Sequence, residues 1–285
     1  MANMTIAYEN LIDSALLSGG SWTNAPLSNI QDRLLAREAR SANLTLASTK
    51  LIIDLQKITN FAAVGIIRHN LSTNGLYRIS ASKLADFSVL EYDTGWLPAW
   101  PPVWPTLALE FEQDNWFSGQ ATDDLIRGYT PLVVTTPSQL VYARYIKIEF
   151  DDTANSAGYI SLARVFVGRS WQTLTNVNYG STVVYEDPTE VTTLLDGPEY
   201  FAERPKYRVS TFSMQWLDPS LEGYNHVMEI QRLIGISGEV IIAPDIDNPE
   251  VMLRTAYLGR LRKLSPLEYR ILDFDGTQYE VKEII

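Results

Sequence analysis

Short, closely spaced runs of β-forming residues constrain the fold of this chain most. Between residues 44 and 92, β-branched and aromatic residues gather in four runs that polar or glycine-containing stretches separate. Two similar runs follow near residue 150. Strands at this spacing are typical of an antiparallel sandwich rather than of alternating parallel strands and helices. The predicted strands are 49–55, 61–69, 76–82, 87–93, 143–150 and 158–168.

The run ARYIKIEF at 143–150 shows the clearest alternation. From Tyr145 onward the odd-numbered positions carry tyrosine, lysine and glutamate, whereas the even-numbered positions from Ile146 carry isoleucine and phenylalanine. A period of two places such residues on opposite faces of a strand. We therefore expect the even-numbered face to be buried and the following segment, 151–158, to form a turn.

After about residue 170 the pattern changes. Segments 181–188 and 207–218 read as strands, and 218–235 reads as one amphipathic helix. Asp218 is a suitable N-cap with Pro219 in the first helical position, and Gly235 is a suitable stop. A helical period of 3.6 predicts that two neighbouring rows form its apolar stripe: Leu221, Tyr224 and Met228, and Val227, Ile230 and Ile234.

The rest of this half holds the runs 239–245, 251–264 and 269–285, and Asp275-Gly276 in the last run is a two-residue hairpin signal. A length of 285 residues indicates about two domains. The fold class is therefore mainly β. We expect an N-terminal antiparallel β-sandwich at residues 1–170 and a smaller C-terminal α+β domain with one main helix at residues 171–285.

Composition excludes several function classes. The chain has no cysteine and two histidines, His69 and His226, so disulfides, zinc–thiolate sites and thiol nucleophiles are impossible. No serine-nucleophile, dinucleotide, phosphate-loop or HExxH motif occurs, and the acidic run 244–250 lacks the spacing of a calcium loop. A net charge of −11 opposes nucleic-acid binding. We expect a non-enzymatic protein with no catalytic residue, no metal and no cofactor.

The chain shows no targeting or membrane segment. Its first twenty residues have no basic region, and Glu9 and Asp13 interrupt their apolar run, unlike a signal peptide. No stretch reaches the roughly 18 apolar residues of a membrane span. The expectation is a protein made in the cytosol without a membrane span.

A segment rich in tryptophan and proline, about 93–131, interrupts the strands. Proline is incompatible with helix interiors and central strands, so we expect most of this insertion to be a long loop. Long loops are often functional. Four of the seven tryptophans lie in one 21-residue stretch of this insertion: Trp96, Trp100, Trp104 and Trp116.

Three interpretations of this insertion stay open. The tryptophans can fold back and cover the sandwich. They can also serve as aromatic anchors for a partner protein, on a loop that proline stiffens. Finally, an indole face can stack on a sugar ring while Asp114, Asn115 and Arg127 bond its hydroxyl groups.

The strand sequences resemble a known family. The run TKLIIDLQKITNFAAVGIIRHN followed by LYRISAS, then ARYIKIEF and GYISLARVFVG, resembles discoidin-type, galactose-binding-like jelly rolls. The resemblance implies a jelly-roll sandwich, and sugar-binding members hold their ligand with His, Arg, Asn and an aromatic residue on loops. Arg68, His69 and Asn70 are the nearest candidates here. The chain departs from the family in its insertion and in lacking the disulfide of many secreted members.

The C-terminal run RTAYLGRLRKLSPLEYRILDFDGTQYEVKEI resembles the C-terminal domain of small tail proteins of long-tailed bacteriophages. This resemblance implies a structural protein of the tail tip or baseplate, assembled in the host cytoplasm and located in the virion. Its partners would be other tail proteins and symmetric copies of itself. The alternative is a carbohydrate-binding module that recognises host-surface glycans. A glycan-degrading enzyme, as a third hypothesis, would need a pair of carboxylates.

Overall fold

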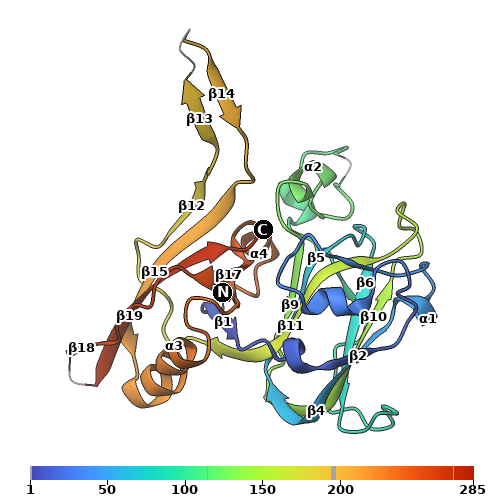
Figure 1. Cartoon of the computed structure of the whole chain (residues 1–285), viewed down its shortest axis with the longest axis horizontal. Coiled ribbons are helices and arrows are strands. Elements are labelled where there is room, and N and C mark those ends of the chain that lie inside the picture. Colours follow the sequence, from blue (N-terminus) through green and yellow to red (C-terminus); the bar gives the residue numbers. More distant parts are fainter. Residues whose placement is uncertain (1, 114, 194–196, 272) are drawn as a thin grey trace.

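The chain folds into antiparallel sheets with few helices (Figure 1). The computed structural model describes residues 2–113, 115–193, 197–271 and 273–285, and for Thr106, Asp123, Arg270 and Ile271 the backbone alone. The helical elements are short: η1 (Leu11–Ser14), η2 (Leu27–Gln31), α1 (Leu46–Thr49), η3 (Thr106–Ala108), α2 (Asp123–Ile126), η4 (Pro219–Met228), α3 (Glu229–Leu233) and α4 (Pro249–Thr255). Among the described residues, no helix is long and apolar enough to cross a membrane.

One large sheet runs through the molecule. Its hydrogen-bonded order is β12 (Thr182–Glu186), β15 (Tyr207–Leu217), β19 (Phe274–Glu283), β17 (Tyr257–Leu261), β16 (Val240–Ala243), β1 (Thr5–Tyr8), β11 (Ser161–Gln172), β5 (Ala63–His69) and β9 (Leu132–Thr135). Two short strands pair at its side: β18 (Glu268–Ile271) with β19, and β3 (Ala39–Arg40) with β11.

A second sheet lies against the β11–β5–β9 end of the first. Its order is β2 (Leu16–Ser18), β4 (Leu51–Phe61), β10 (Val141–Asp151), β6 (Leu76–Ser82) and β7 (Tyr92–Asp93), and β8 (Leu97–Pro98) pairs with β6. The two sheets enclose one core, to which β10 contributes Ile146, Ile148 and Phe150, all without solvent exposure. The predicted antiparallel sandwich and the buried face of β10 are therefore confirmed.

The C-terminal part builds a separate apolar cluster on the same sheet. Val227 and Ile230 of the helical segment pack there with Phe212 of β15 and Val281 of β19. Strand β1 joins the two parts, because it pairs with β16 on one side and with β11 on the other. The sheet is thus continuous through β11, where the predicted division at residues 170 and 171 falls.

A buried arginine also ties the two parts together. The side chain of Arg164 in β11 is fully buried and donates to Glu239 Oε2 at 2.8 Å and to the carbonyl oxygen of Ile30 at 3.0 Å. It also contacts Asp13. A buried guanidinium needs such partners because an unpaired charge away from water is costly.

One predicted element of the C-terminal part differs in the structure. The segment 218–235 begins with a ten-residue π-helix, and although Asp218 caps it as expected, the row Leu221, Tyr224 and Met228 is about half exposed. The wider π-turn rotates these side chains away from the position that a 3.6 period predicts. The prediction that this row is buried was therefore wrong. The prediction for the second row, which begins at Val227, is confirmed, because that row is buried.

Two local predictions were also wrong. Asp275 and Gly276 lie inside β19, where they face β18, and the chain reverses before them: Ile271 pairs with Phe274, and Asp273 has a φ of 71°. Of the predicted strand 87–93, only Tyr92 and Asp93 form a strand. Phe87 there adopts a φ of 55°, which is incompatible with an extended strand.

Candidate functional site

Two of the predicted residues at the end of β5, His69 and Asn70, are hydrogen-bonded within the protein. His69 is 5% exposed, and its Nδ1 accepts from the backbone N–H of Leu71 at 3.3 Å. Asn70 donates through Nδ2 to the carbonyl oxygen of Tyr159 at 2.9 Å and accepts through Oδ1 from the N–H of Ser161 at 2.7 Å. These two side chains therefore fix the end of the sandwich.

His69 lies in an apolar environment. Its ring packs against Trp100 with the centroids 5.4 Å apart, and its Nε2 is buried without a hydrogen-bond partner among the described residues. Burial disfavours the charged imidazolium and lowers the pKa of His69 to about 4. Since Nδ1 accepts a hydrogen bond, we infer a neutral ring with its proton on Nε2.

Arg68 is more accessible than its two neighbours. Its guanidinium lies 3.7 Å from a carboxylate oxygen of Glu38, and its side chain is 42% exposed. The backbone of Arg68 has a φ of 54°, an uncommon conformation for a residue with a Cβ. The N–H of Arg68 donates to the carbonyl oxygen of Pro131 at 2.7 Å, which fixes this conformation.

The four tryptophans of the insertion have different environments. Trp100 is 7% exposed, belongs to the sandwich core and donates through its indole N–H to the carbonyl oxygen of Leu71 at 2.9 Å. Trp96 is 39% exposed, and Trp104 and Trp116 are partly buried. The structure thus brings Trp100 and His69 together but leaves the other three tryptophans elsewhere in the insertion.

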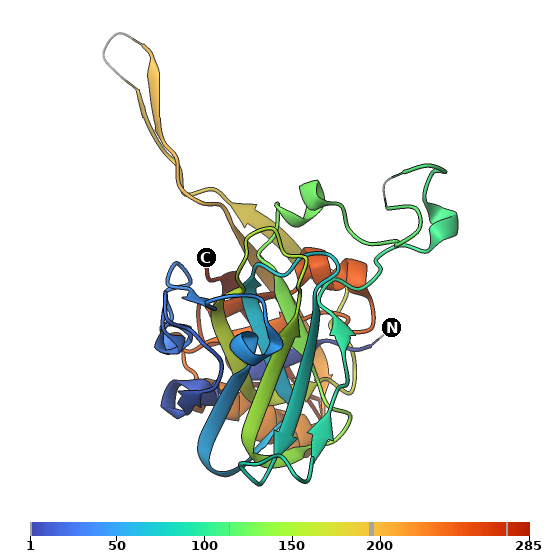
Figure 2. The same cartoon turned by 90° about the vertical axis from the view of Figure 1, so that its right-hand side faces the viewer.

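Most of the insertion forms an arm, residues 103–130, that leaves the sandwich (Figure 2). Both Val103 and Trp104 donate their backbone N–H to the carbonyl oxygen of Gly119, which joins the two ends of the segment 103–119 within the arm. Gly119 has a φ of 63°, and a Cβ there would collide with the carbonyl oxygen of Trp104, so glycine is required. The predicted loop character of the insertion is confirmed.

The arm exposes large apolar side chains. Leu107 is 99% exposed and Phe117 is 90% exposed. Trp116 packs edge-on against Phe111 and Phe117, at centroid distances of 5.2 and 4.7 Å. Side chains as exposed as Leu107 and Phe117 leave apolar surface in water, which is typical of a contact site.

A polar cleft of about 540 Å3 lies on the arm, next to Thr73 of the sandwich. Asn115 and Gln120 shape its wall: Asn115 donates to the carbonyl oxygen of Gln120 at 2.8 Å, and Gln120 donates to that of Thr73 at 2.8 Å. Ser118 and Arg127 also line it. Asp114, the third polar residue predicted for sugar binding, lies outside the described residues.

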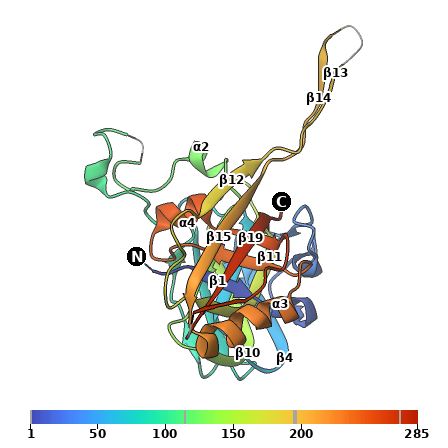
Figure 3. The ribbon, with the colours of Figure 1, turned by 90° about the vertical axis from the view of Figure 1, so that its left-hand side faces the viewer.

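The largest projecting feature is a hairpin formed by β13 (Glu190–Thr193) and β14 (Glu199–Ala202) (Figures 1 and 3). It continues the β12–β15 pair away from the body, and the arm projects from the same end of the molecule. The strand prediction missed this hairpin. Two four-residue runs on either side of Asp196-Gly197 were the available signal.

Apolar side chains lie on both faces of this hairpin. Val191 and Phe201 face each other across the pair and are 54% and 52% exposed. Tyr200, opposite Thr192 on the other face, is 64% exposed. An ion pair between Arg204 and Glu190 braces its base at 2.6 Å. Neither face of the hairpin is covered by another layer of the described chain.

The described residues include no group of three or more His, Cys, Asp or Glu side chains that could hold a metal ion. In the acidic run predicted not to bind calcium, Asn248 caps α4 by accepting from the N–H groups of Glu250 and Val251. Asp245 accepts from the N–H of Ala2 at 2.8 Å. These side chains therefore organise local backbone.

No protein-family model and no curated protein matches the sequence. Among solved structures, the chain is similar to a carbohydrate-binding module from a family 31 glycoside hydrolase of Clostridium perfringens, at 12% identity and a TM-score of 0.36 over 56% of this chain and 98% of that module. A fucose-binding module of Streptococcus pneumoniae matches at 14% identity and a TM-score of 0.37, over 57% of this chain and 96% of that one.

A family 89 glycoside hydrolase of Clostridium perfringens matches at 14% identity and a TM-score of 0.37. The match covers 56% of this chain and only 14% of the length of that enzyme. Carbohydrate-binding modules are thus among the similar structures. Because the TM-scores lie below 0.5, we base the function on the residues of this chain alone.

Proposed function

We propose that this chain is a non-catalytic assembly protein that docks onto neighbouring subunits through its projecting hairpin. The uncovered faces of β13–β14, with Val191, Tyr200 and Phe201 about half exposed, carry this proposal. An isolated two-stranded hairpin is at best marginally stable in water. A subunit that covers the hairpin would supply the missing layer, and backbone groups along its outer edges are available for strand pairing.

The assembly that we propose is the tail tip or baseplate of a tailed bacteriophage, built in the host cytoplasm from symmetric copies and other tail proteins. The sequence resemblance of residues 254–284 to tail proteins supports it, and so does a hairpin that reaches beyond the body of the subunit. In a ring of identical copies, each copy has a surface that meets a different surface of its neighbour.

Tail particles purified from a lysate of the bacterial host test this proposal. Mass spectrometry should find the chain in the particles, and a Tyr200→Ser/Phe201→Ser variant should enter them at less than about a tenth of the wild-type level, since buried aromatic anchors dominate interfaces. Tyr142→Ser is the matched control, because Tyr142 is 53% exposed on the sandwich. Particles that lack the chain, or that take up the hairpin variant normally, would refute the proposal.

The polar cleft on the arm favours glycan recognition as a second candidate function. Its wall includes Ser118 and the guanidinium of Arg127, which lies 3.8 Å from Asp124 and is 79% exposed. The amides of Asn115 and Gln120 also line it, with their N–H groups bonded to backbone carbonyl oxygens of the protein. Hydroxyl, amide and guanidinium groups in a cleft are suited to bonding sugar hydroxyls.

Calorimetry with glycans selected on an array tests this second function. Arg127→Ala should weaken binding about tenfold, which corresponds to 1.4 kcal/mol. Arg37→Ala is the control, because Arg37 is similarly exposed at 64% but lies outside the cleft. If the folded protein binds no glycan on the array, this function is excluded, whereas assembly through the hairpin is unaffected.

A further inference from the structure

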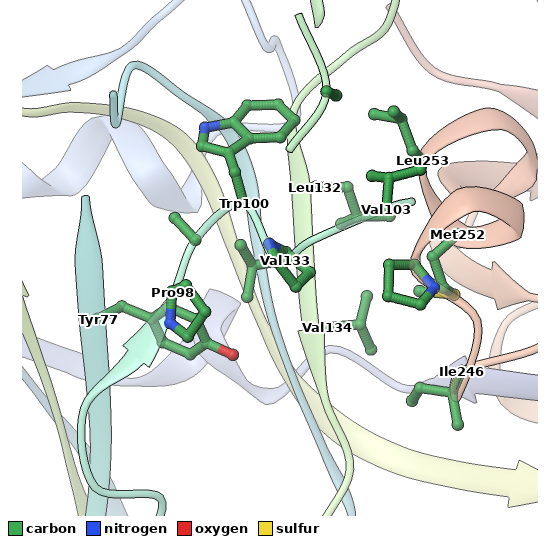
Figure 4. Close-up of a pocket in the computed structure, with 14 residues that line it drawn as sticks. Tyr77, Pro98, Trp100, Val103, Leu132, Val133, Val134, Ile246, Met252 and Leu253 are labelled. Carbon is green, nitrogen blue, oxygen red and sulfur yellow. The ribbon is translucent and has the colours of Figure 1, made fainter. Parts of the chain in front are cut away.

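An apolar pocket with a volume of about 130 Å3 lies between the sandwich and α4 (Figure 4). Strand β9 contributes Val133, the segment before the arm contributes Pro98 and Trp100, and α4 contributes Met252 and Leu253. The pocket thus lies where the N-terminal and C-terminal parts of the chain meet.

The side chains that line the pocket suit an apolar occupant. None of the described residues that line it is charged. The hydroxyl of Tyr77 is hydrogen-bonded to Thr135 Oγ1 at 3.1 Å, and the indole N–H of Trp100 donates to Leu71. Because both side-chain polar groups already have partners, an apolar group can enter without leaving either of them unpaired.

The walls resist collapse into this space. Pro98, Pro101 and Pro249 line the pocket, and their rings restrict the backbone. Helix α4 contains no fully buried residue, so Met252 and Leu253 remain half-buried against the sandwich. The pocket is therefore preformed, and it is open to solvent along the helix.

We propose that this pocket is an anchor site for one uncharged side chain of a partner protein, between leucine and phenylalanine in size. A cavity of about 150 Å3 with apolar walls takes up benzene, so about 130 Å3 suits one such group. Val103 and Ala121 belong both to the pocket wall and to the arm, which projects from the same end of the molecule as the hairpin. A subunit that covers both projections would therefore lie over the pocket. That the side chain belongs to a partner protein follows only if the proposed assembly function is correct.

Toluene, the side-chain analogue of phenylalanine, tests the pocket by NMR of 13C-methyl methionine in the full-length protein. We expect a saturable shift of the Met252 methyl signal. Met4 and Met214 are buried in the other cluster, and Met228 is 47% exposed, so these three report on non-specific binding. Toluene that shifts no methionine saturably, or all of them equally, would overturn the pocket and leave assembly through the hairpin untouched.

A matched pair of variants locates the binding. Ala121→Leu places a larger side chain at the pocket wall and should weaken toluene binding tenfold or more, about 1.4 kcal/mol. Ala154→Leu makes the same change at an exposed turn and should leave the binding unchanged. Equal toluene affinity in both variants would overturn the assignment to this pocket.

Capped amino acids test whether the pocket accepts an amino-acid side chain attached to a peptide backbone. N-acetyl-phenylalaninamide and N-acetyl-leucinamide should shift Met252 as toluene does, whereas N-acetyl-lysinamide should not. If toluene binds but neither apolar capped amino acid does, the pocket takes free small molecules and a partner side chain is excluded.

Discussion

Strand β10 and the projecting hairpin place similar side chains in opposite surroundings. On β10, Phe150 is fully buried because the β11–β5–β9 end of the large sheet covers its face. On the hairpin, Phe201 is 52% exposed because no layer of the described chain lies over it. Burial of a β-strand therefore depends on the layer opposite, and a strand with apolar residues but no such layer indicates a partner.

The largest effect expected from this comparison is at Phe150. Phe150→Ala should lower the free energy of unfolding by about 3–5 kcal/mol, because it removes buried apolar contacts and leaves a cavity between the sheets. Denaturant unfolding followed by fluorescence measures the change. A loss below about 1 kcal/mol would mean that the two sheets do not pack as described.

A second, pH-dependent effect is expected at His69. The pKa of this buried ring is about 4, so the unfolded chain takes up a proton below about pH 6.5 while the folded protein does not. Stability should therefore fall as the pH drops from about 6.5 to about 4, by up to about 3 kcal/mol at 1.4 kcal/mol per pH unit.

Denaturant unfolding at several pH values between 7 and 4 tests this expectation. His69→Phe should flatten the dependence, because phenylalanine does not titrate. His226→Gln is the control: the pKa of His226 is also lowered by burial, but less of its surface is buried. An unchanged pH dependence in His69→Phe would contradict a neutral, buried histidine.

A smaller effect is expected at the edge of the second sheet. Arg78 donates to Asp93 from Nε at 2.9 Å and also from Nη2. These hydrogen bonds, with that from the N–H of Gly95, outweigh the raising effect of burial and lower the pKa of Asp93 to about 2. Because this pKa lies below its unfolded value, the pair stabilises the fold above about pH 4, and the stabilisation disappears towards pH 2.

Asp93→Asn should cost about 1 kcal/mol or less at pH 7, since water screens a partly exposed ion pair. Unfolding of the variant and the wild type at pH 7 and at pH 2.5 measures the difference, which should shrink at the lower pH. A difference that grows at pH 2.5 would contradict the ion pair as its cause.

The sequence predicts well those features that one segment determines. The alternation in 143–150 identifies the buried face of β10, and Asp218 identifies the start of the helical segment. Neither prediction needs knowledge of another part of the chain. Two other local patterns failed. The segment 219–228 forms a π-helix instead of the predicted α-helix. Asp275 and Gly276, predicted as a turn, lie within β19, where Asp275 is buried.

The candidate sites depend on such long-range contacts. The resemblance to sugar-binding jelly rolls makes His69 a candidate ligand residue, but its burial under Trp100 comes from a segment about thirty residues away. The pocket joins β9 to α4, which more than a hundred residues separate. No local pattern reveals either arrangement.

The smallest effect on stability, and the sharpest test of the comparison, is at Phe201. Phe201→Ala should change the free energy of unfolding of the free chain by less than about 0.5 kcal/mol, because an exposed side chain on an uncovered hairpin loses few contacts. Phe150→Ala is its matched counterpart in a covered strand. Denaturant unfolding of both variants under the same conditions gives the two losses of unfolding free energy, which can then be compared. If Phe201→Ala destabilised the free chain as strongly as Phe150→Ala, the hairpin would already be covered within the subunit, and its aromatic residues would not be available to a partner.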